Sequence, residues 1–217
     1  MNTSPSYNPE RSGRAWLKPI LILGLLSLAL AACSGIALSF SPEQAVMQGV
    51  LNNPRPNAVV DATSVKALQR LEAAGKTFVI VSNQQQADGH IEDCLWLMEA
   101  RRSPILGWVS GSGGGSCSGQ VGGDPAPREP LSVGSGTMSG DSATDPGISQ
   151  TYGKVNQDDI VKVRVTWSDG QVQEVAVVHA SYAAIRAGKF NMTRVEGLNE
   201  KDEAVYQFNR ATGPVKQ

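Results

Sequence analysis

This sequence has almost no excess of positive or negative charge, few cysteines and few aromatic residues. Nineteen Lys+Arg stand against twenty Asp+Glu, so the basic surface of a nucleic-acid-binding protein is missing. Three cysteines are too few for a small scaffold held together by many disulfides. Charged residues make up 18% of the 217 residues, below the roughly 25% of ordinary soluble domains. A chain of this length has room for one domain or two small ones.

A basic leader and an uncharged apolar run open the chain. Residues 1–18 contain three basic residues and one acid, and residues 19–32 are almost entirely apolar. This layout is typical of a bacterial secretory signal. The positive-inside rule places the leader in the cytoplasm and the rest of the chain on the extracytoplasmic side.

The apolar run ends in Leu30-Ala31-Ala32-Cys33, which resembles the lipobox of bacterial lipoproteins. The resemblance implies that residues 1–32 are a signal peptide. It also implies that Cys33 receives lipid such as palmitate and becomes the first residue of the mature protein. In Gram-negative members of that family, a serine in the place of Ser34 is compatible with sorting to the outer membrane.

Two other interpretations of this segment stay open. Residues 19–40 contain no charge, and about twenty apolar residues can span a bilayer, so an uncleaved anchor up to about residue 40 is one of them. Ordinary cleaved secretion is the other. The lipoprotein, the uncleaved anchor and ordinary secretion all place the bulk of the chain outside the cytoplasm. The lipoprotein would be attached to the membrane through Cys33, and the uncleaved anchor through a helix over 19–40.

Export would change the balance of charge. Residues 1–32 hold three basic residues and one acidic residue, so the remainder has a net charge near −3. A mildly acidic surface is not attracted to anionic lipids or to nucleic acid. We therefore expect the anchor to hold the protein at the membrane, and we expect no nucleic-acid partner.

Residues 41–75 predict two short helices. Ser41 is a good N-cap for the first, with Pro42 at the first helical position and Gln44 completing a capping box. This helix is predicted to end near Leu51.

The second helix is predicted over 62–74. Val65, Leu68 and Leu71 recur there at helical spacing, and Gly75 follows the expected end.

Residues 76–217 predict a β-rich extracytoplasmic domain. Along 160–167, valines alternate with Lys162, Arg164 and Thr166, so one face of this strand is expected to be dry and the other wet. Strands are predicted over 77–81, 94–98, 105–109, 160–167, 172–178, 189–195 and 204–208. The expected fold class is mainly β, an antiparallel β-sandwich-like domain, with α+β as the alternative.

Residues 111–147 have the composition of a flexible segment. They hold 11 of the 23 glycines, together with many Ser, Thr, Asp and Pro residues. Such a stretch buries little surface and loses much chain entropy on ordering, so we expect a long Gly/Ser-rich loop.

Residues 151–208 look like a pattern found in uncharacterised secreted and lipid-anchored bacterial proteins. Tyr152-Gly153, Asp159, Asp169-Gly170 and Tyr206 carry this resemblance. It implies no known activity, cofactor or catalytic residue.

Cys94 and Cys117 remain once Cys33 is assigned to lipid. In an oxidising compartment this even remainder predicts a disulfide, which closes a loop of about 24 residues and contributes roughly 3 kcal/mol. The rival interpretation is a catalytic cysteine paired with His90 or His179, and nothing in the spacing favours it.

Residues 90–94 place a histidine, two acids and Cys94 in one stretch without predicting a metal site. Zinc sites use three or four ligands at recurring spacings, and no second cluster accompanies this one. His179 and Ser181 lack an orienting acid and an oxyanion hole that the sequence can place. We therefore expect no catalytic set, no metal and no cofactor.

The sequence thus favours a membrane-anchored envelope lipoprotein that is not an enzyme. Its β-domain is expected to bind a partner, such as another envelope protein, or to serve a structural role. The alternatives are a single-pass membrane accessory subunit and a cell-envelope hydrolase that uses His179 or His90.

Overall fold

The computed structural model describes residues 39–119, 129–140 and 144–215. The predicted signal peptide and Cys33 lie outside these ranges, as does nearly all of the alternative anchor. Within them, no helix is both long and apolar enough to cross a bilayer.

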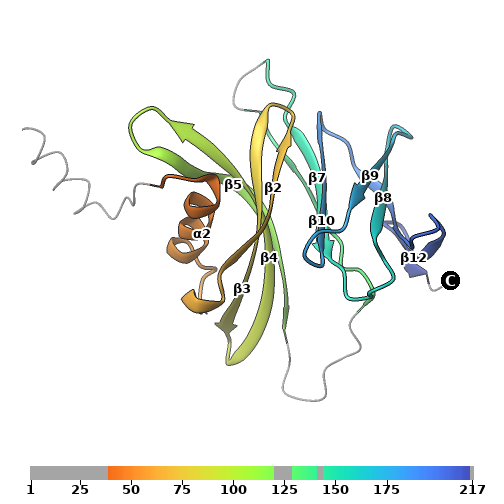
Figure 1. The fold of residues 1–217 in the computed structure, drawn as a ribbon, viewed down its shortest axis with the longest axis horizontal. Helices are drawn as coiled ribbons and strands as arrows, with labels where there is room; N and C mark the ends of the chain where they lie inside the picture. Colours follow the sequence, from red (N-terminus) through yellow and green to blue (C-terminus); the bar gives the residue numbers. More distant parts are fainter. Residues whose placement is uncertain (1–38, 120–128, 141–143, 216–217) are drawn as a thin grey trace, which may run out of the picture. The chain divides into compact units, whose positions relative to one another are not determined.

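The protein is mainly β, and its strands pair in antiparallel sheets (Figure 1). The elements of the first half are α2 (Pro42–Asn52), β1 (Ala58–Val60), the 3-10 turn η1 (Ala62–Ser64), β2 (Lys66–Ala73), β3 (Lys76–Ala87), β4 (His90–Ser103) and β5 (Gly107–Gly119). Those of the second half are β6 (Gly134–Met138), β7 (Ile148–Lys154), β8 (Lys162–Trp167), β9 (Val172–Ala176), β10 (Ser181–Ala187), β11 (Met192–Leu198), β12 (Ala204–Asn209) and β13 (Gly213–Val215).

The strands form three sheets, which we call A, C and D. In sheet A, both β1 and β2 pair with β3, which is followed by β4 and the outermost strand β5. Its long strands curl in Figure 1. Sheet C has the order β10-β7-β6, and sheet D has the order β13-β12-β11-β8-β9.

Helix α2 covers one face of sheet A. Ser41 caps it by accepting a hydrogen bond from the Gln44 backbone N–H, and the Gln44 side chain accepts one from the Phe40 N–H. The apolar side chains Val46 and Val50 point to the sheet, where they pack against buried residues of β3 and β4. The helix ends at Asn52, before Asn53 and Pro54.

The prediction of a second helix over 62–74 is wrong, because this segment forms η1 and β2. Leu68 bulges out of the β2–β3 ladder between Ala67 and Gln69. The extra residue reverses the alternation, so Leu68 and Leu71 pack on the same face although they are three residues apart. A β-bulge therefore produced the spacing that indicated a helix.

The prediction of a flexible loop over 111–147 is also wrong for two parts of that range. Residues 111–119 continue β5, and 134–138 form β6. In β5 the glycines leave room for neighbours: a Cβ on Gly115 would collide with the indole of Trp96 on β4. The missing side chain is thus a packing requirement of the strand rather than a sign of flexibility.

The sheets are stacked, with sheet C between the other two. Phe78, Ile80, Leu95 and Leu97 on the face of sheet A away from α2 pack against sheet C, and the opposite face of sheet C packs on sheet D. The central strand β7 is consequently buried on both faces. The Ser149 hydroxyl donates to the Gly188 carbonyl at 2.8 Å, and the Thr151 hydroxyl donates to the Gly134 carbonyl at 2.9 Å. The buried Oε1 of Gln150 has no hydrogen-bond partner among the described residues.

Sheet D has the pattern that its sequence predicts. Val163, Val165 and Trp167 of β8 are buried, while Lys162 and Arg164 lie on the solvent face. The turn at 168–170 joins β8 to β9 as a hairpin. Strands β6, β7, β10 and the short strands β1 and β13 have no counterpart among the predicted strands.

Candidate functional site

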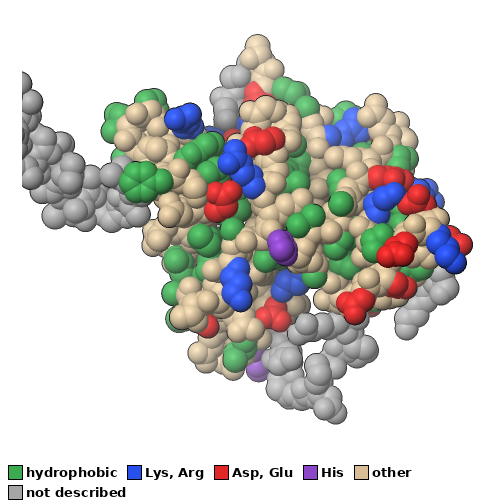
Figure 2. Space-filling model, viewed as in Figure 1, with side chains coloured by type: hydrophobic (Ala, Val, Ile, Leu, Met, Phe, Trp, Pro, Cys, Tyr) green, Lys and Arg blue, Asp and Glu red, His purple; other side chains and the backbone are tan. Residues whose placement is uncertain are grey.

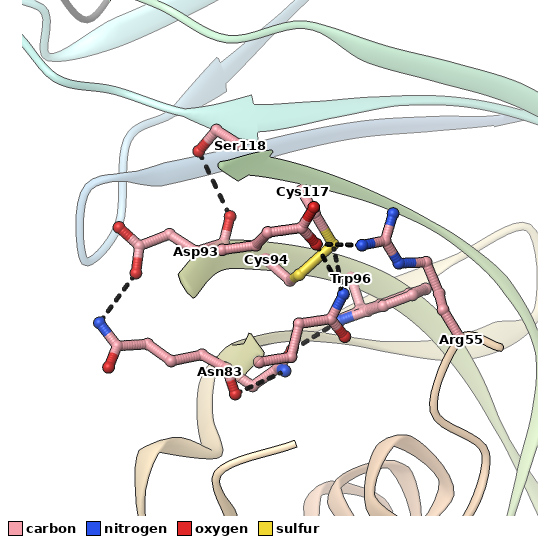
Figure 3. Close-up of polar contacts among 10 residues, drawn as sticks. Arg55, Asn83, Asp93, Cys94, Trp96, Cys117 and Ser118 are labelled. Carbon is pink, nitrogen blue, oxygen red and sulfur yellow. Dashed lines mark hydrogen bonds and ion pairs between the residues drawn. A yellow bond between two sulfur atoms is a disulfide. The ribbon is translucent and has the colours of Figure 1, made fainter. Parts of the chain in front are cut away.

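Sheet A carries a polar cluster around a disulfide, on the face that α2 covers elsewhere (Figure 3). Cys94 of β4 and Cys117 of β5 stand directly opposite each other, with their Cα atoms 4.0 Å apart, and their sulfur atoms are bonded. The predicted disulfide is confirmed. It joins the outermost strand of the sheet to its neighbour, and Cys94 is completely buried.

Arg55, Gln85 and Glu92 surround the disulfide. Glu92 forms an ion pair with Arg55, and the Gln85 amide Nε2 donates to the same carboxylate at 2.9 Å. That amide also lies 3.6 Å from the Cys117 sulfur. Gln85 is buried, and its Oε1 has no hydrogen-bond partner in the part of the chain that is described.

One further hydrogen bond belongs to the cluster, and two others lie on the opposite face of the same strands. The indole N–H of Trp96 donates to the Asn83 side-chain oxygen at 2.6 Å, which fixes the ring over β5. On the other face of the same strands, the Gln84 amide donates to Asp93 at 2.9 Å (Figure 3). The Ser118 hydroxyl donates to the Asp93 carbonyl at 3.4 Å.

This cluster is a poor donor set for a metal ion. Glu92 and the two cysteine sulfurs lie within 4.8 Å of one another. Both sulfurs belong to the disulfide, so neither is a thiolate, and zinc binding to cysteine needs the thiolate. The remaining carboxylate is already neutralised by Arg55. The arrangement can hold the 53–57 segment and β5 on the sheet.

The two histidines are exposed and lie on different elements of the fold. His90 begins β4 in sheet A, and His179 lies in the β9–β10 turn with a positive φ of 48°. Ser181, two residues after His179, is buried, and its hydroxyl donates to the Val178 carbonyl at 2.8 Å. Among the described residues, neither imidazole contacts a carboxylate or a hydroxyl in a catalytic arrangement.

A small polar pocket of about 110 Å³ lies where sheet C meets sheet D. Ser135 and Thr137 of β6 line one side, and Asn191 and Arg210 line the other. The Arg210 guanidinium donates to the Asn191 side-chain oxygen at 3.0 Å. A pocket of this volume is well below the 300–1,000 Å³ or so of ordinary small-molecule sites.

The solvent face of sheet D carries a ladder of ion pairs. Glu174 of β9 pairs with Arg164 and Lys162 of β8, and Lys162 also pairs with Asp202. The hydrogen bond from Arg164, then its charge, holds the pKa of Glu174 below its usual range. The hydrogen bond from Lys162 likewise lowers the pKa of Asp202. Glu174 and Asp202 are exposed and Lys162 and Arg164 are partly exposed, so the ladder is a hydrated charged surface.

Comparisons with protein-family models, curated proteins and solved structures find no match to this chain.

The sequence predicted the disulfide but missed the cluster around it. Gln85 and Arg55 meet Glu92 from other strands and loops, 7 and 37 residues away in the chain. No local spacing indicates such contacts. The register of β3 and β4 pairs Gln85 with Glu92 and Asn83 with Cys94, and the path of the chain before β1 brings Arg55 to Glu92.

Proposed function

We propose that this protein is a lipoprotein of the bacterial envelope whose β-domain serves as a binding or structural module. The observation that carries the proposal is the Cys94–Cys117 disulfide. Structural disulfides persist mainly in oxidising compartments, which supports export of this domain. With these two cysteines joined, the remaining one is Cys33, directly after the apolar run of Leu30-Ala31-Ala32.

The arrangement of side chains favours binding or support over turnover. Near the disulfide, the Gln85 amide donates to Glu92 and the Trp96 indole donates to Asn83. The two histidines are exposed, His90 at the start of β4 and His179 in the β9–β10 turn. Hydrolysis by a serine–histidine mechanism needs a nucleophile, a base and an orienting acid in contact. No observation in the described residues favours the hydrolase, so the proposal keeps the binding or structural role.

The proposed lipid attachment is tested in cells that process lipoproteins. The wild-type full chain and the C33A variant are expressed with labelled palmitate, together with the double variant C94A/C117A as a matched cysteine control. We expect label in the wild type and in C94A/C117A and none in C33A. Unlabelled wild-type protein that stays in the membrane at the full length of 217 residues would instead identify an uncleaved anchor.

Extraction of the same wild-type and C33A proteins in mild detergent distinguishes a free-standing lipoprotein from the accessory-subunit alternative. A subunit held by a membrane partner should co-purify with that partner after extraction in mild detergent, in wild type and C33A alike. A free-standing lipoprotein should be extracted alone, and C33A should leave the membrane fraction if its signal is still cleaved.

A further inference from the structure

Of the described residues, the two most exposed large hydrophobic side chains lie near each other at one end of the domain. Phe40 is 87% exposed and Ile105 is 85% exposed. Ser39, the residue before Phe40, bridges to Gly107 and Trp108 at the start of β5, and the Trp108 N–H donates to the Ser39 carbonyl at 3.0 Å. The β4–β5 turn that contains Ile105 is thus fixed beside Phe40, and we call this end of the domain the apolar tip.

The apolar tip has a fixed geometry. The Phe40 N–H donates to the Gln44 side chain in the cap of α2, at 3.2 Å. In the turn, the Ile105 and Leu106 backbone N–H groups both lie within hydrogen-bond distance of the Ser103 hydroxyl. Both exposed side chains therefore project from ordered backbone. Figure 2 shows hydrophobic side chains at the edge of the molecule where the described chain begins.

The short length of chain between Cys33 and Ser39 favours the bilayer surface as the occupant of the apolar tip. Residues 34–38 separate Cys33 from Ser39, and six residue steps span at most about 22 Å even when fully extended. If Cys33 carries lipid, the tip cannot leave the bilayer surface by more than this distance. An uncleaved anchor ending near residue 40 would hold the tip closer still.

The residues behind the tip suit the boundary between lipid and water. Trp108 is partly buried there, with the Arg70 guanidinium 6.0 Å from its ring and the exposed Arg102 opposite it in the β4–β5 ladder. Tryptophan and arginine side chains are favoured at that boundary, because each combines an apolar body with a polar end. Glu43 in the first turn of α2 offsets part of the basic charge. Apolar insertion, rather than attraction to anionic lipid, is therefore the expected mode of contact.

We infer that the β-domain rests on the membrane through Phe40 and Ile105, which insert into the surface of the bilayer that holds its own N-terminal anchor. This inference rests on the proposed lipid or membrane attachment. It adds a defined orientation, in which sheet A and α2 face the membrane and sheet D, two layers away, faces the periplasm or the exterior. A partner would then meet the domain on sheet D and its charged face.

The orientation is tested with tryptophan reporters in the processed full chain. The I105W variant places a reporter at the tip, F40W serves as a second one, and V172W is the matched control. Val172 is 55% exposed at the start of β9 in sheet D. Each protein is reconstituted into phosphatidylcholine vesicles with and without brominated chains, and the emission of the wild type is subtracted.

We expect brominated lipid to remove most of the emission added by I105W, and aqueous acrylamide to have little effect on it. V172W should show the reverse. Quenching of I105W and F40W by acrylamide to the same extent as V172W would overturn the inference. Resistance of the tip reporters to both quenchers would also overturn it, because a second copy or another protein would then cover the tip.

Flotation of the same vesicles on a density gradient separates this inference from the proposed function. If the protein floats but only acrylamide quenches its tip reporters, the anchor is present and the tip does not rest on the membrane. That result contradicts this inference and leaves the proposed attachment intact. Protein that stays at the bottom of the gradient has no membrane attachment, and both proposals then fail. Far-UV circular dichroism of the variants should match the wild type, since all three substituted side chains are exposed.

Discussion

The strands β5 and β8 are both parts of antiparallel sheets, yet their side chains contribute to the core in opposite ways. In β8, Val163, Val165 and Trp167 are buried. The charged Arg164 and the polar Thr166 stand between them in the chain. In β5, every residue from 110 to 116 is glycine or serine, and this part of the strand has little side chain of its own to bury.

The partners of β5 supply what its own sequence lacks. The Trp96 indole of β4 lies over Gly115, and the Cys94–Cys117 bond joins the two strands covalently. Backbone pairing with β4 continues along nearly the whole strand. The comparison teaches that a strand can be stabilised by side chains of its neighbour, provided that its own residues are small enough to admit them.

The largest effect should come from truncating a side chain in β8. We expect W167A to lower the free energy of unfolding by about 3–5 kcal/mol, because Trp167 is buried in the core between sheets C and D. The corresponding truncation in β5, S116A, should change it by less than about 0.5 kcal/mol. Urea unfolding of both variants measures the difference, and equal losses would contradict the contrast between the strands.

Removing the disulfide should have the next largest effect, and it acts on β5. We expect C94A/C117A to destabilise the protein by about 3 kcal/mol, on the chain-entropy model for the loop that this bond closes. Hydrogen exchange should show the loss as faster exchange of the β5 amides, while β8 keeps its protection. Uniform acceleration in both strands would mean that β5 is not held separately by this bond.

A methyl group added to β5 should have a smaller effect. We expect G115A to cost about 1–3 kcal/mol, because its Cβ collides with the hydrogen-bonded indole of Trp96. Gly136 of β6 is the matched control, since the atom nearest to its added Cβ is 3.8 Å away. Thermal unfolding of G115A and G136A compares the two; a neutral G115A would show that β5 tolerates side chains.

The smallest effect should come from the ion pairs on the outer face of β8. The pKa of Glu174 is lowered in the folded protein, so its contribution to stability is present above the unfolded pKa, near 4.5. It is lost as the pH falls through the folded pKa. We therefore expect E174Q to lose stability relative to the wild type at pH 7 but not at pH 2.

Urea midpoints at both pH values, with the exposed turn variant D88N as control, measure this difference. High salt should reduce it, because exposed pairs are screened. A stability difference for E174Q that persists unchanged at pH 2 would assign the effect to packing rather than to charge.

Local patterns predicted sheet D well, because the alternation in β8 and the turn at 168–170 encode the hairpin in adjacent residues. They failed in β2, where the bulge at Leu68 gave an i, i+3 spacing, and in β5, where glycine composition indicated a loop. They also missed β7, because a strand buried on both faces has no alternation to detect. In each failure the deciding contact comes from another strand.

The candidate site likewise contains one bond that the sequence predicts and other contacts that it does not. The pairing of Cys94 with Cys117 could be predicted, because counting cysteines needs no knowledge of the fold. The contacts of Gln85 and Arg55 with Glu92 could not, because they depend on the β3–β4 register and on the path of the chain before β1.

The intact mass of the protein extracted from membranes in mild detergent tests the central claim most directly. The account predicts a chain of residues 33–217 that carries diacylglycerol on Cys33 and lacks two hydrogen atoms for the Cys94–Cys117 bond. Alkylation should add mass only after reduction. An unmodified chain of 217 residues, or a mature chain with free thiols at Cys94 and Cys117, would contradict it.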